Sequence, residues 1–286
     1  MIAIVAACQA GTALAQEEDE FDHGTWVLIL NSYHPDHVWT QNVLAAEVAR
    51  IREVFPSARF LIEYLDAKRF PSPDRLQLLE EAIAAKLRDR RPALVVTNDN
   101  AAFDFAVRQR EALFPGVPIV FAGYNGYDEL AGRLPPEVTG VASTIAPRAT
   151  VETALRLHPG TRRVLVAIDA TRSAQGTRLD ILRDVAPLRG HIEFTFLDDR
   201  SMDEMLAYLR SAPDDAIVLM SYYNRGTDGQ FYSLHEAIRL VAENSAVPVY
   251  HLYDFGLGHG VVGGHLLDGD MHGRQAGDLA VRVLSG

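Results

Sequence analysis

Short apolar runs alternate with amphipathic segments along the first half of the chain. The run at 26–30 is followed by apolar residues at helical spacing over 43–55. The alternation continues, with strands predicted at 60–65, 94–97 and 119–122 and helices at 76–87 and 101–113. Runs that are apolar on both faces and joined by amphipathic helices are typical of a parallel sheet. The pattern therefore predicts an α/β lobe.

The second half of the chain repeats this alternation. Strands are predicted at 164–168, 192–197, 217–220, 249–252 and 261–266, with helices at 179–185, 202–209, 234–242 and 274–284. The two halves are divided at 138–144, after the pair Pro135-Pro136 and before a helix that begins near Pro147. We therefore predict two similar halves.

The first residues predict a signal for export. Residues 2–15 are apolar, and Ala13-Leu14-Ala15 has the small side chains that a signal peptidase requires. We expect residues 1–15 to be a signal peptide and 16–23 an acidic leader, which places the folded part in the periplasm or outside the cell. An alternative is a lipobox that ends at Cys8 and would lipidate this residue. Because Cys8 is the only cysteine, cleavage after Ala15 leaves no disulfide and no thiol chemistry.

The charge balance argues against a nucleic-acid partner. The formal net charge is -11, whereas binding to phosphates depends on clustered Lys and Arg side chains. Part of the acidity lies in the run 17–20, which we interpret as a solvent-facing leader.

No stretch of the sequence carries a complete catalytic or metal-binding motif. His34-x-x-His37 lacks the spacing of helical zinc motifs and has no third ligand that can be named. Residues 256–260 resemble a dinucleotide loop, but a predicted strand rather than a helix follows them. A nucleophile elbow and a phosphate loop are also missing. We expect a non-catalytic domain with no cofactor and no metal, and keep a periplasmic enzyme as a third alternative.

Polar and aromatic residues gather in the loops that follow the predicted strands. In an open parallel sheet these loops line the ligand crevice, because backbone amides and helix N-termini converge there. Aromatic and amide side chains suit a planar or apolar ligand with a polar edge. The candidate ligand-binding residues are Tyr33, His34, Trp39, Asn98, Asp99, Tyr124, Asn125, Asp169, Thr171, Ser173, Tyr222, Tyr223 and Asp254.

Each of these candidates has a structural alternative. Asn98, Asp99 and Thr171 are of the types that cap helices, and the aromatic residues would also suit packing between elements. Asp254 would either bind the ligand or brace the connection between the halves. Carboxylates from both halves predict a ligand with a hydrogen-bond donor or a cationic group.

Several short segments together resemble one protein family. They are Ser32-Tyr33-His34 with Trp39-Thr40, 64–69, 120–125, 139–141 and 260–264. As a set they resemble the type I periplasmic-binding-protein domains of ABC-transporter substrate-binding proteins and of sensor histidine kinase ectodomains. The resemblance runs from 26 to 286 and implies two lobes, each a parallel sheet flanked by helices, that close around a ligand. It implies an N-terminal lobe of 24–142 that is completed by 256–286, and a C-terminal lobe of 143–255.

Two details resemble the sensor-kinase branch of this group. They are Ser221-Tyr222-Tyr223-Asn224 with Gly229, and the ending through Gly273, Ala276 and 284–286. The resemblance implies the ectodomain of a two-component sensor, whose partner is a membrane kinase portion. The alternative is a solute-binding protein that delivers its cargo to an ABC permease. Pairing of two copies as a homodimer is a further alternative, and the ligand could be an amino acid, a nucleobase, an aromatic acid or a sugar.

Overall fold

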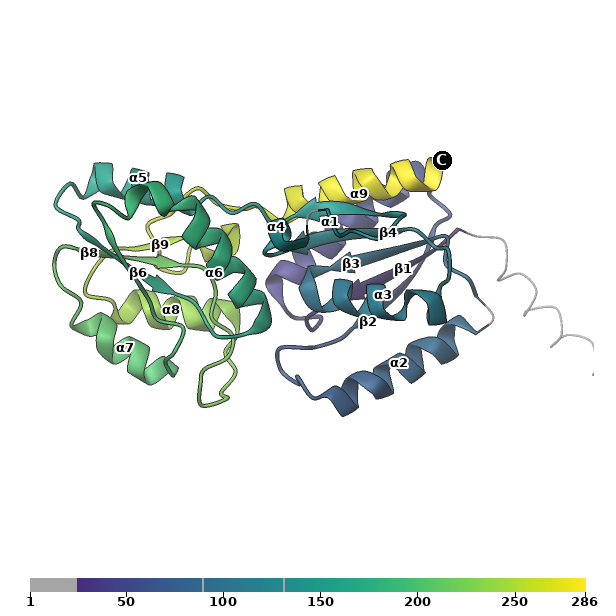
Figure 1. Ribbon diagram of the computed structural model, residues 1–286, viewed down its shortest axis with the longest axis horizontal. Coiled ribbons are helices and arrows are strands. Elements are labelled where there is room, and N and C mark those ends of the chain that lie inside the picture. Colours follow the sequence, from purple (N-terminus) through teal and green to yellow (C-terminus); the bar gives the residue numbers. More distant parts are fainter. Residues whose placement is uncertain (1–24, 89, 131) are drawn as a thin grey trace, which may run out of the picture.

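The computed structural model describes residues 25–88, 90–130 and 132–286. The predicted signal peptide, the acidic leader and Cys8 lie outside these residues. Two α/β lobes lie side by side, and the chain passes between them at one edge (Figure 1). The predicted fold class, two parallel sheets flanked by helices, is confirmed.

The first lobe is built on a five-stranded parallel sheet in the order β2-β1-β3-β4-β5. The strands are β1 (Trp26–Asn31), β2 (Arg59–Tyr64), β3 (Leu94–Asn98), β4 (Ile119–Tyr124) and β5 (Val138–Ala142). The helices are α1 (Val38–Val54), α2 (Pro73–Leu87), α3 (Asp99–Leu113) and α4 (Tyr127–Leu130). Successive residues of a strand face opposite sides of the sheet, so Val27 shares a cluster with Ile51 of α1, and Leu28 shares one with Phe105 of α3. Helices on both faces explain why the inner strands β1 and β4 are apolar over most of their length, whereas the edge strand β2 also carries Arg59 and Glu63.

The second lobe repeats this plan with a four-stranded parallel sheet in the order β7-β6-β8-β9. The strands are β6 (Arg163–Ala167), β7 (Glu193–Phe196), β8 (Ala216–Met220) and β9 (Val249–His251). The helices are α5 (Pro147–Leu157), α6 (Arg172–Asp184), α7 (Met202–Arg210) and α8 (Leu234–Asn244), with 3-10 turns at Ala186–Leu188 and Asp254–Gly256. Capping boxes at Ser201 and Ser233 begin α7 and α8 and satisfy backbone amides there.

The last helix, α9 (Gly269–Ser285), lies along α1 in the first lobe (Figure 1). Two glycines permit this close approach, because a Cβ on Gly273 would collide with the backbone of Val43 and one on Gly277 with the side chain of Arg50. Within the described residues the chain therefore crosses between the lobes at 143–146 and again at 252–268. None of the described helices is long and apolar enough to cross a membrane.

Two segments differ from the prediction made from the sequence. Residues 261–266 do not form a strand, and Gly263 makes only an isolated bridge to Tyr250. The φ angle of Gly263 is 140°, which is far from the values of an extended strand and interrupts the pairing. Residues 138–142, which were not predicted as a strand, form β5 and pair in parallel with β4.

Candidate ligand-binding site

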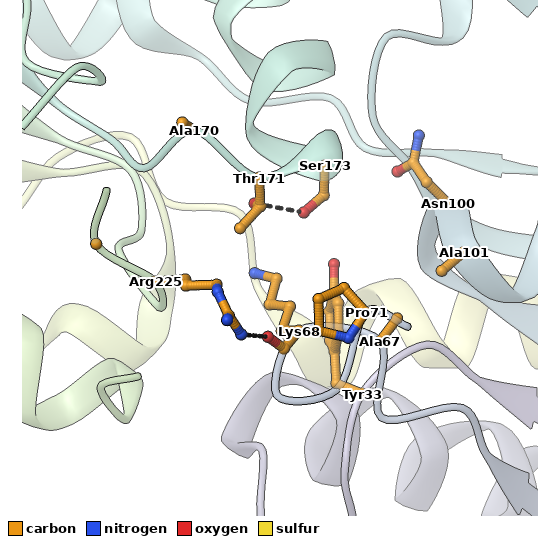
Figure 2. Close-up of a pocket in the computed structure, with 11 residues that line it drawn as sticks. Tyr33, Ala67, Lys68, Pro71, Asn100, Ala101, Ala170, Thr171, Ser173 and Arg225 are labelled. Atoms are coloured by element: carbon orange, nitrogen blue, oxygen red, sulfur yellow. Dashed lines mark hydrogen bonds between the residues drawn. The ribbon is translucent and has the colours of Figure 1, made fainter. Parts of the chain in front are cut away.

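A cavity of about 300 Å³ lies between the two lobes, where the carboxyl ends of their strands meet. This volume is at the small end of the range for small-molecule sites. Loops that follow β1 and β2 and the first turn of α3 line it from the first lobe. Loops that follow β6 and β8 and the first turn of α6 line it from the second (Figure 2). The lining residues are Tyr33, Ala67, Lys68, Pro71, Asn100, Ala101, Ala170, Thr171, Ser173, Arg225 and Gly226. We call this space the main cavity.

Lys68 is the buried cation of the site. Its side chain leaves the β2–α2 loop and places Nζ 2.6 Å from Oδ1 of Asn224 in the second lobe. The same atom lies 4.5 Å from the ring centre of Tyr33 and 4.2 Å from that of Tyr222, so the ammonium is held between two aromatic rings. Burial lowers the pKa of Lys68, and the charges of the more distant carboxylates oppose this shift. Among the described residues, no carboxylate forms an ion pair with Lys68.

Arg225 makes the reverse connection, from the second lobe to the first. Its Nη1 donates to the carbonyl oxygens of Lys68 and Arg69, at 3.1 Å and 3.3 Å (Figure 2). A short bridge from Arg225 to Phe231 forms the base of the loop that presents the guanidinium. The two lobes therefore contact each other through hydrogen bonds in both directions.

Asp169 holds the loops of the second lobe that line the main cavity. Its Oδ1 accepts from the backbone N–H and the hydroxyl of Thr171, at 2.9 Å and 2.5 Å. Its Oδ2 accepts from the backbone N–H groups of Asn224 and Arg225, at 2.8 Å and 3.4 Å. Both carboxylate oxygens are thus occupied by the protein's own donors. Asp169 positions Thr171 and Arg225 and does not itself line the main cavity.

A second cavity of about 20 Å³ lies deeper in the cleft and shares Tyr33 and Lys68 with the main cavity. The space is about that of a single water molecule. It is lined by Asp99, which begins α3 with a left-handed φ of 67°. Burial raises the pKa of Asp99 to about 7, and the charge of Lys68 opposes the shift.

Trp39 lines this small cavity but is mainly a packing residue in the structure. Its side chain is 4% exposed. The ring lies 5.6 Å from that of Tyr253 in the crossing segment and 5.5 Å from that of His272 in α9. Trp39 therefore joins the first lobe to the connection between the lobes.

Seven of the predicted residues line one of the two cavities. Tyr33, Thr171 and Ser173 line the main cavity, and Tyr33 also lines the deeper one with Trp39, Asp99, Asn125 and Tyr222. The structure thus brings residues of both predicted halves together around the same space.

The other candidates lie outside these two cavities. Asn98 is buried below the cleft, where its Nδ2 donates to Asn31 and Glu47. Asn98 and Thr171 stand at the N-cap positions of α3 and α6, yet their side chains form no cap hydrogen bond. Tyr124 packs against Phe103 in the core of the first lobe.

Three further candidates serve structural contacts. The hydroxyl of Tyr223 donates to the backbone carbonyl of Arg200 at 2.9 Å. His34 packs against Phe231 across the cleft and lines a separate cavity of about 50 Å³. Asp254 accepts from the backbone N–H of the next residue, at 2.9 Å, and of Gly269, at 3.3 Å. Of the two roles considered for Asp254, these contacts favour bracing the connection between the lobes over binding the ligand.

Sequence reasoning missed Lys68, Asn100 and Arg225. Asn100, which lies in the first turn of α3, and Arg225 belong to segments that were expected to line the crevice, but neither was selected as a binding residue. Lys68 lies in the loop after 60–65, and the rule that strand-end loops line the crevice would have found it if it had been applied to that strand.

The described part of the chain holds no group of three or more His, Cys, Asp and Glu side chains arranged to bind a metal ion. The rings of His34 and His37 pack edge to face, with centroids 5.7 Å apart. Burial lowers the pKa of His37 well below its ordinary value, and the charge of Lys68 adds to the shift.

No protein-family model and no curated protein sequence matches the chain, whereas several solved structures match most of its length. An ABC domain from Streptococcus pneumonia in complex with L-Trp is 14% identical, with a TM-score of 0.62 over 91% of this chain and 85% of that one. An ABC transporter solute binding protein from Bacillus halodurans with bound myo-inositol is 15% identical, with a TM-score of 0.61 over 93% and 91%. A periplasmic sugar binding protein from Legionella pneumophila is 15% identical, with a TM-score of 0.60 over 91% and 94%.

The chain has the type I periplasmic-binding-protein fold. At identities of 14% and 15%, the likeness concerns the fold alone. In this chain the main cavity is lined by two basic side chains, Lys68 and Arg225.

Proposed function

We propose that this type I fold binds a small molecule in the main cavity, outside the cytoplasm, and catalyses no reaction. The observation that carries the proposal is that one cavity is lined from both lobes, by Tyr33 and Lys68 on one side and by Thr171 and Arg225 on the other. A ligand that contacts both lobes stabilises the arrangement in which they are close together. The similar structures support this role, since one is an ABC domain in complex with L-Trp and another is an ABC transporter solute binding protein with bound myo-inositol.

We infer that a membrane protein responds to the bound state. The residues at 221–224 resemble sensor-kinase ectodomains, which favours a domain that transmits ligand occupancy to a kinase in a two-component system. Two of the similar solved structures, those from Bacillus halodurans and Legionella pneumophila, belong to ABC transport systems and favour delivery of the ligand to a permease. Both roles use the same cleft and the same closure of the lobes.

Binding can be tested with a thermal-shift screen of metabolites combined with small-angle X-ray scattering. A ligand that binds only the folded state stabilises it by about 2.7 kcal/mol at 100 times its Kd. We expect a compound that binds to raise the melting temperature in a saturable way. Where the lobes are open in ligand-free protein, the same compound should reduce the radius of gyration. If no compound of a broad library shifts the melting temperature, the proposed function is wrong.

The two roles can be separated by the gene. A reading frame that continues past residue 286 into an apolar run of about 20 residues and a kinase would support the sensor. A stop codon next to permease genes would support transport.

A further inference from the structure

The side chains around the main cavity have an unbalanced charge. Two basic residues, Lys68 and Arg225, line it, and none of its described lining residues is Asp or Glu. We propose that the ligand is a carboxylate with an apolar or aromatic body and no cationic group. This inference rests on the proposed function and specifies the ligand class of the same site.

The ammonium of Lys68 is the first part of the argument. An ammonium group has three donors, and among the described residues Nζ has one hydrogen-bond partner, Asn224. The ring faces of Tyr33 and Tyr222 flank it, but a buried charge is stable only when it is paired and hydrogen-bonded. Figure 2 shows the amino group pointing toward the space beside Thr171 and Ser173. A ligand carboxylate at this place would supply the missing counter-charge.

Two hydroxyl groups, those of Thr171 and Ser173, line the main cavity together with the ammonium of Lys68. The Thr171 hydroxyl donates to Asp169 at 2.5 Å, and its oxygen lies 3.3 Å from Oγ of Ser173. Because the Thr171 proton is used by Asp169, Ser173 is the donor in the second contact. That contact is long, and the Ser173 hydroxyl also hydrogen-bonds the hydroxyls of Tyr33 and Tyr222. A carboxylate oxygen is a stronger acceptor than any of these neutral hydroxyls and would take the Ser173 proton from them.

The nearby acidic residues do not offer an anionic partner to a cationic ligand. Asp169 is occupied by donors from its own lobe. Asp66 pairs with Arg69 at 2.6 Å. Asp99 lines only the deeper cavity of about 20 Å³. A cationic group in the main cavity would therefore meet Lys68 and Arg225 without a compensating carboxylate, which differs from the ligand expected from the sequence.

The rest of the cavity accommodates an apolar body. Its lining includes Ala67, Pro71, Ala101 and Ala170, with the ring of Tyr33. A neighbouring cavity of about 200 Å³ shares three of these residues and continues between α2 and α3; it is lined by Leu65, Ala67, Phe70, Pro71, Ser72, Pro73, Arg75, Leu76, Leu79 and Ala101. Apolar walls with a few convergent polar groups are typical of ligand sites. The body of the ligand would extend from Lys68 toward this space.

Calorimetric titration with matched compounds tests the inference. The probes are the acids phenylacetate, benzoate, 3-phenylpropionate and octanoate, the primary amide of each, and phenethylamine as a cation. We expect at least one acid to bind at least tenfold more tightly than its amide, and phenethylamine not to bind. The ratio of the affinity for the acid to the affinity for its amide should fall at least tenfold in Lys68→Met. It should persist in Lys86→Met, which removes an exposed lysine that pairs with Glu63 on the outside of the same lobe.

The possible results distinguish a failure of the proposed ligand class from a failure of the proposed function. If no acid binds more tightly than its amide, or if Lys68→Met keeps the preference, the inference is wrong. If in that case a neutral or cationic metabolite binds in the cleft, the proposed function stands; if no library compound binds, both fail. Arg225→Gln is measured in parallel and is also expected to reduce the preference for acids, so that the test does not depend on the folding of Lys68→Met.

Discussion

Nζ of Lys68 lies 2.6 Å from Oδ1 of Asn224, and this hydrogen bond joins the two lobes across the cleft. Arg225, the residue after Asn224, donates back to the carbonyl oxygen of Lys68. The adjacent residues Asn224 and Arg225 of the second lobe are therefore both hydrogen-bonded to Lys68 of the first lobe. A ligand in the main cavity has to keep these bonds or replace them.

Asn224→Leu should weaken this connection. It removes the acceptor of the buried ammonium, and an unsatisfied buried charged group costs about 3 kcal/mol. We expect a lower free energy of unfolding in urea and a larger radius of gyration. Asn224→Asp keeps an acceptor at the same place and should retain the compact shape. Equal scattering curves for wild-type protein and Asn224→Leu would show that the bond does not hold the lobes.

Gly176→Ala should keep the lobes apart without unfolding them. Gly176 lies in α6 of the second lobe, and a Cβ there would be 2.7 Å from the carbonyl oxygen of Asn125 in the first lobe. Within each lobe, alanine in a helix is favoured by roughly 0.5–1 kcal/mol over glycine. We expect a larger radius of gyration with no loss of stability. Gly190→Ala is the control, because nothing lies within 4 Å of its Cβ; an identical shape for both variants would contradict the prediction.

Glu47 should make stability depend on pH. Burial raises its pKa to about 8, from 4.5 in the unfolded chain, and a hydrogen bond from Asn98 opposes the shift. Since the folded state holds the proton more tightly, the stabilisation is complete below pH 4.5 and is lost as the pH rises through 8. Glu47→Gln imitates the protonated side chain and should remove this slope.

The measurement is urea unfolding from pH 5 to pH 8. Each pH unit between the two pKa values changes stability by up to about 1.4 kcal/mol, so the difference between wild-type protein and Glu47→Gln should change by a few kcal/mol. Glu111→Gln, at an exposed position of α3, should leave the wild-type slope intact. Parallel curves for wild-type protein and Glu47→Gln would show that Glu47 is ionised in the folded state.

Trp39→Ala should destabilise the protein even without ligand. The ring is 4% exposed and packs against the crossing segment and α9. Truncation of a buried tryptophan costs about 3–5 kcal/mol. Trp39→Phe retains part of the packing and should lose less. A Trp39→Ala protein that unfolds like the wild type would place the ring outside the core.

The strands were predictable because helices cover both faces of each sheet. The runs at 26–30 and 217–220 are apolar at every position, and the structure forms β1 and β8 there. The start of α9 was less predictable: the helix begins at Gly269, where Asp268 caps it through a bond from the N–H of Met271, five residues before the predicted start. Its first turn has no apolar repeat, so the cap alone marks it.

The site was only partly predictable, because its chemistry depends on side-chain directions. Tyr33, Thr171 and Ser173 follow strands that end at the cleft, and this spacing is visible in the sequence. The sequence does not show that Asp169 is occupied by donors of its own lobe. Nor does it show that Lys68 reaches the opposite lobe, since its partner Asn224 is distant along the chain.

The place of α9 also sets the order in which the lobes are completed during synthesis. The strands of the first sheet leave the ribosome first, the whole second lobe follows, and α9 is the last of the described elements. Until then, the face that contains Val27 and Val96 lacks Ala280 and the other apolar side chains of this helix. Exposed apolar surface makes incomplete chains prone to aggregation. The lobe that begins first is therefore finished last, and one of its apolar faces stays uncovered until α9 has been made.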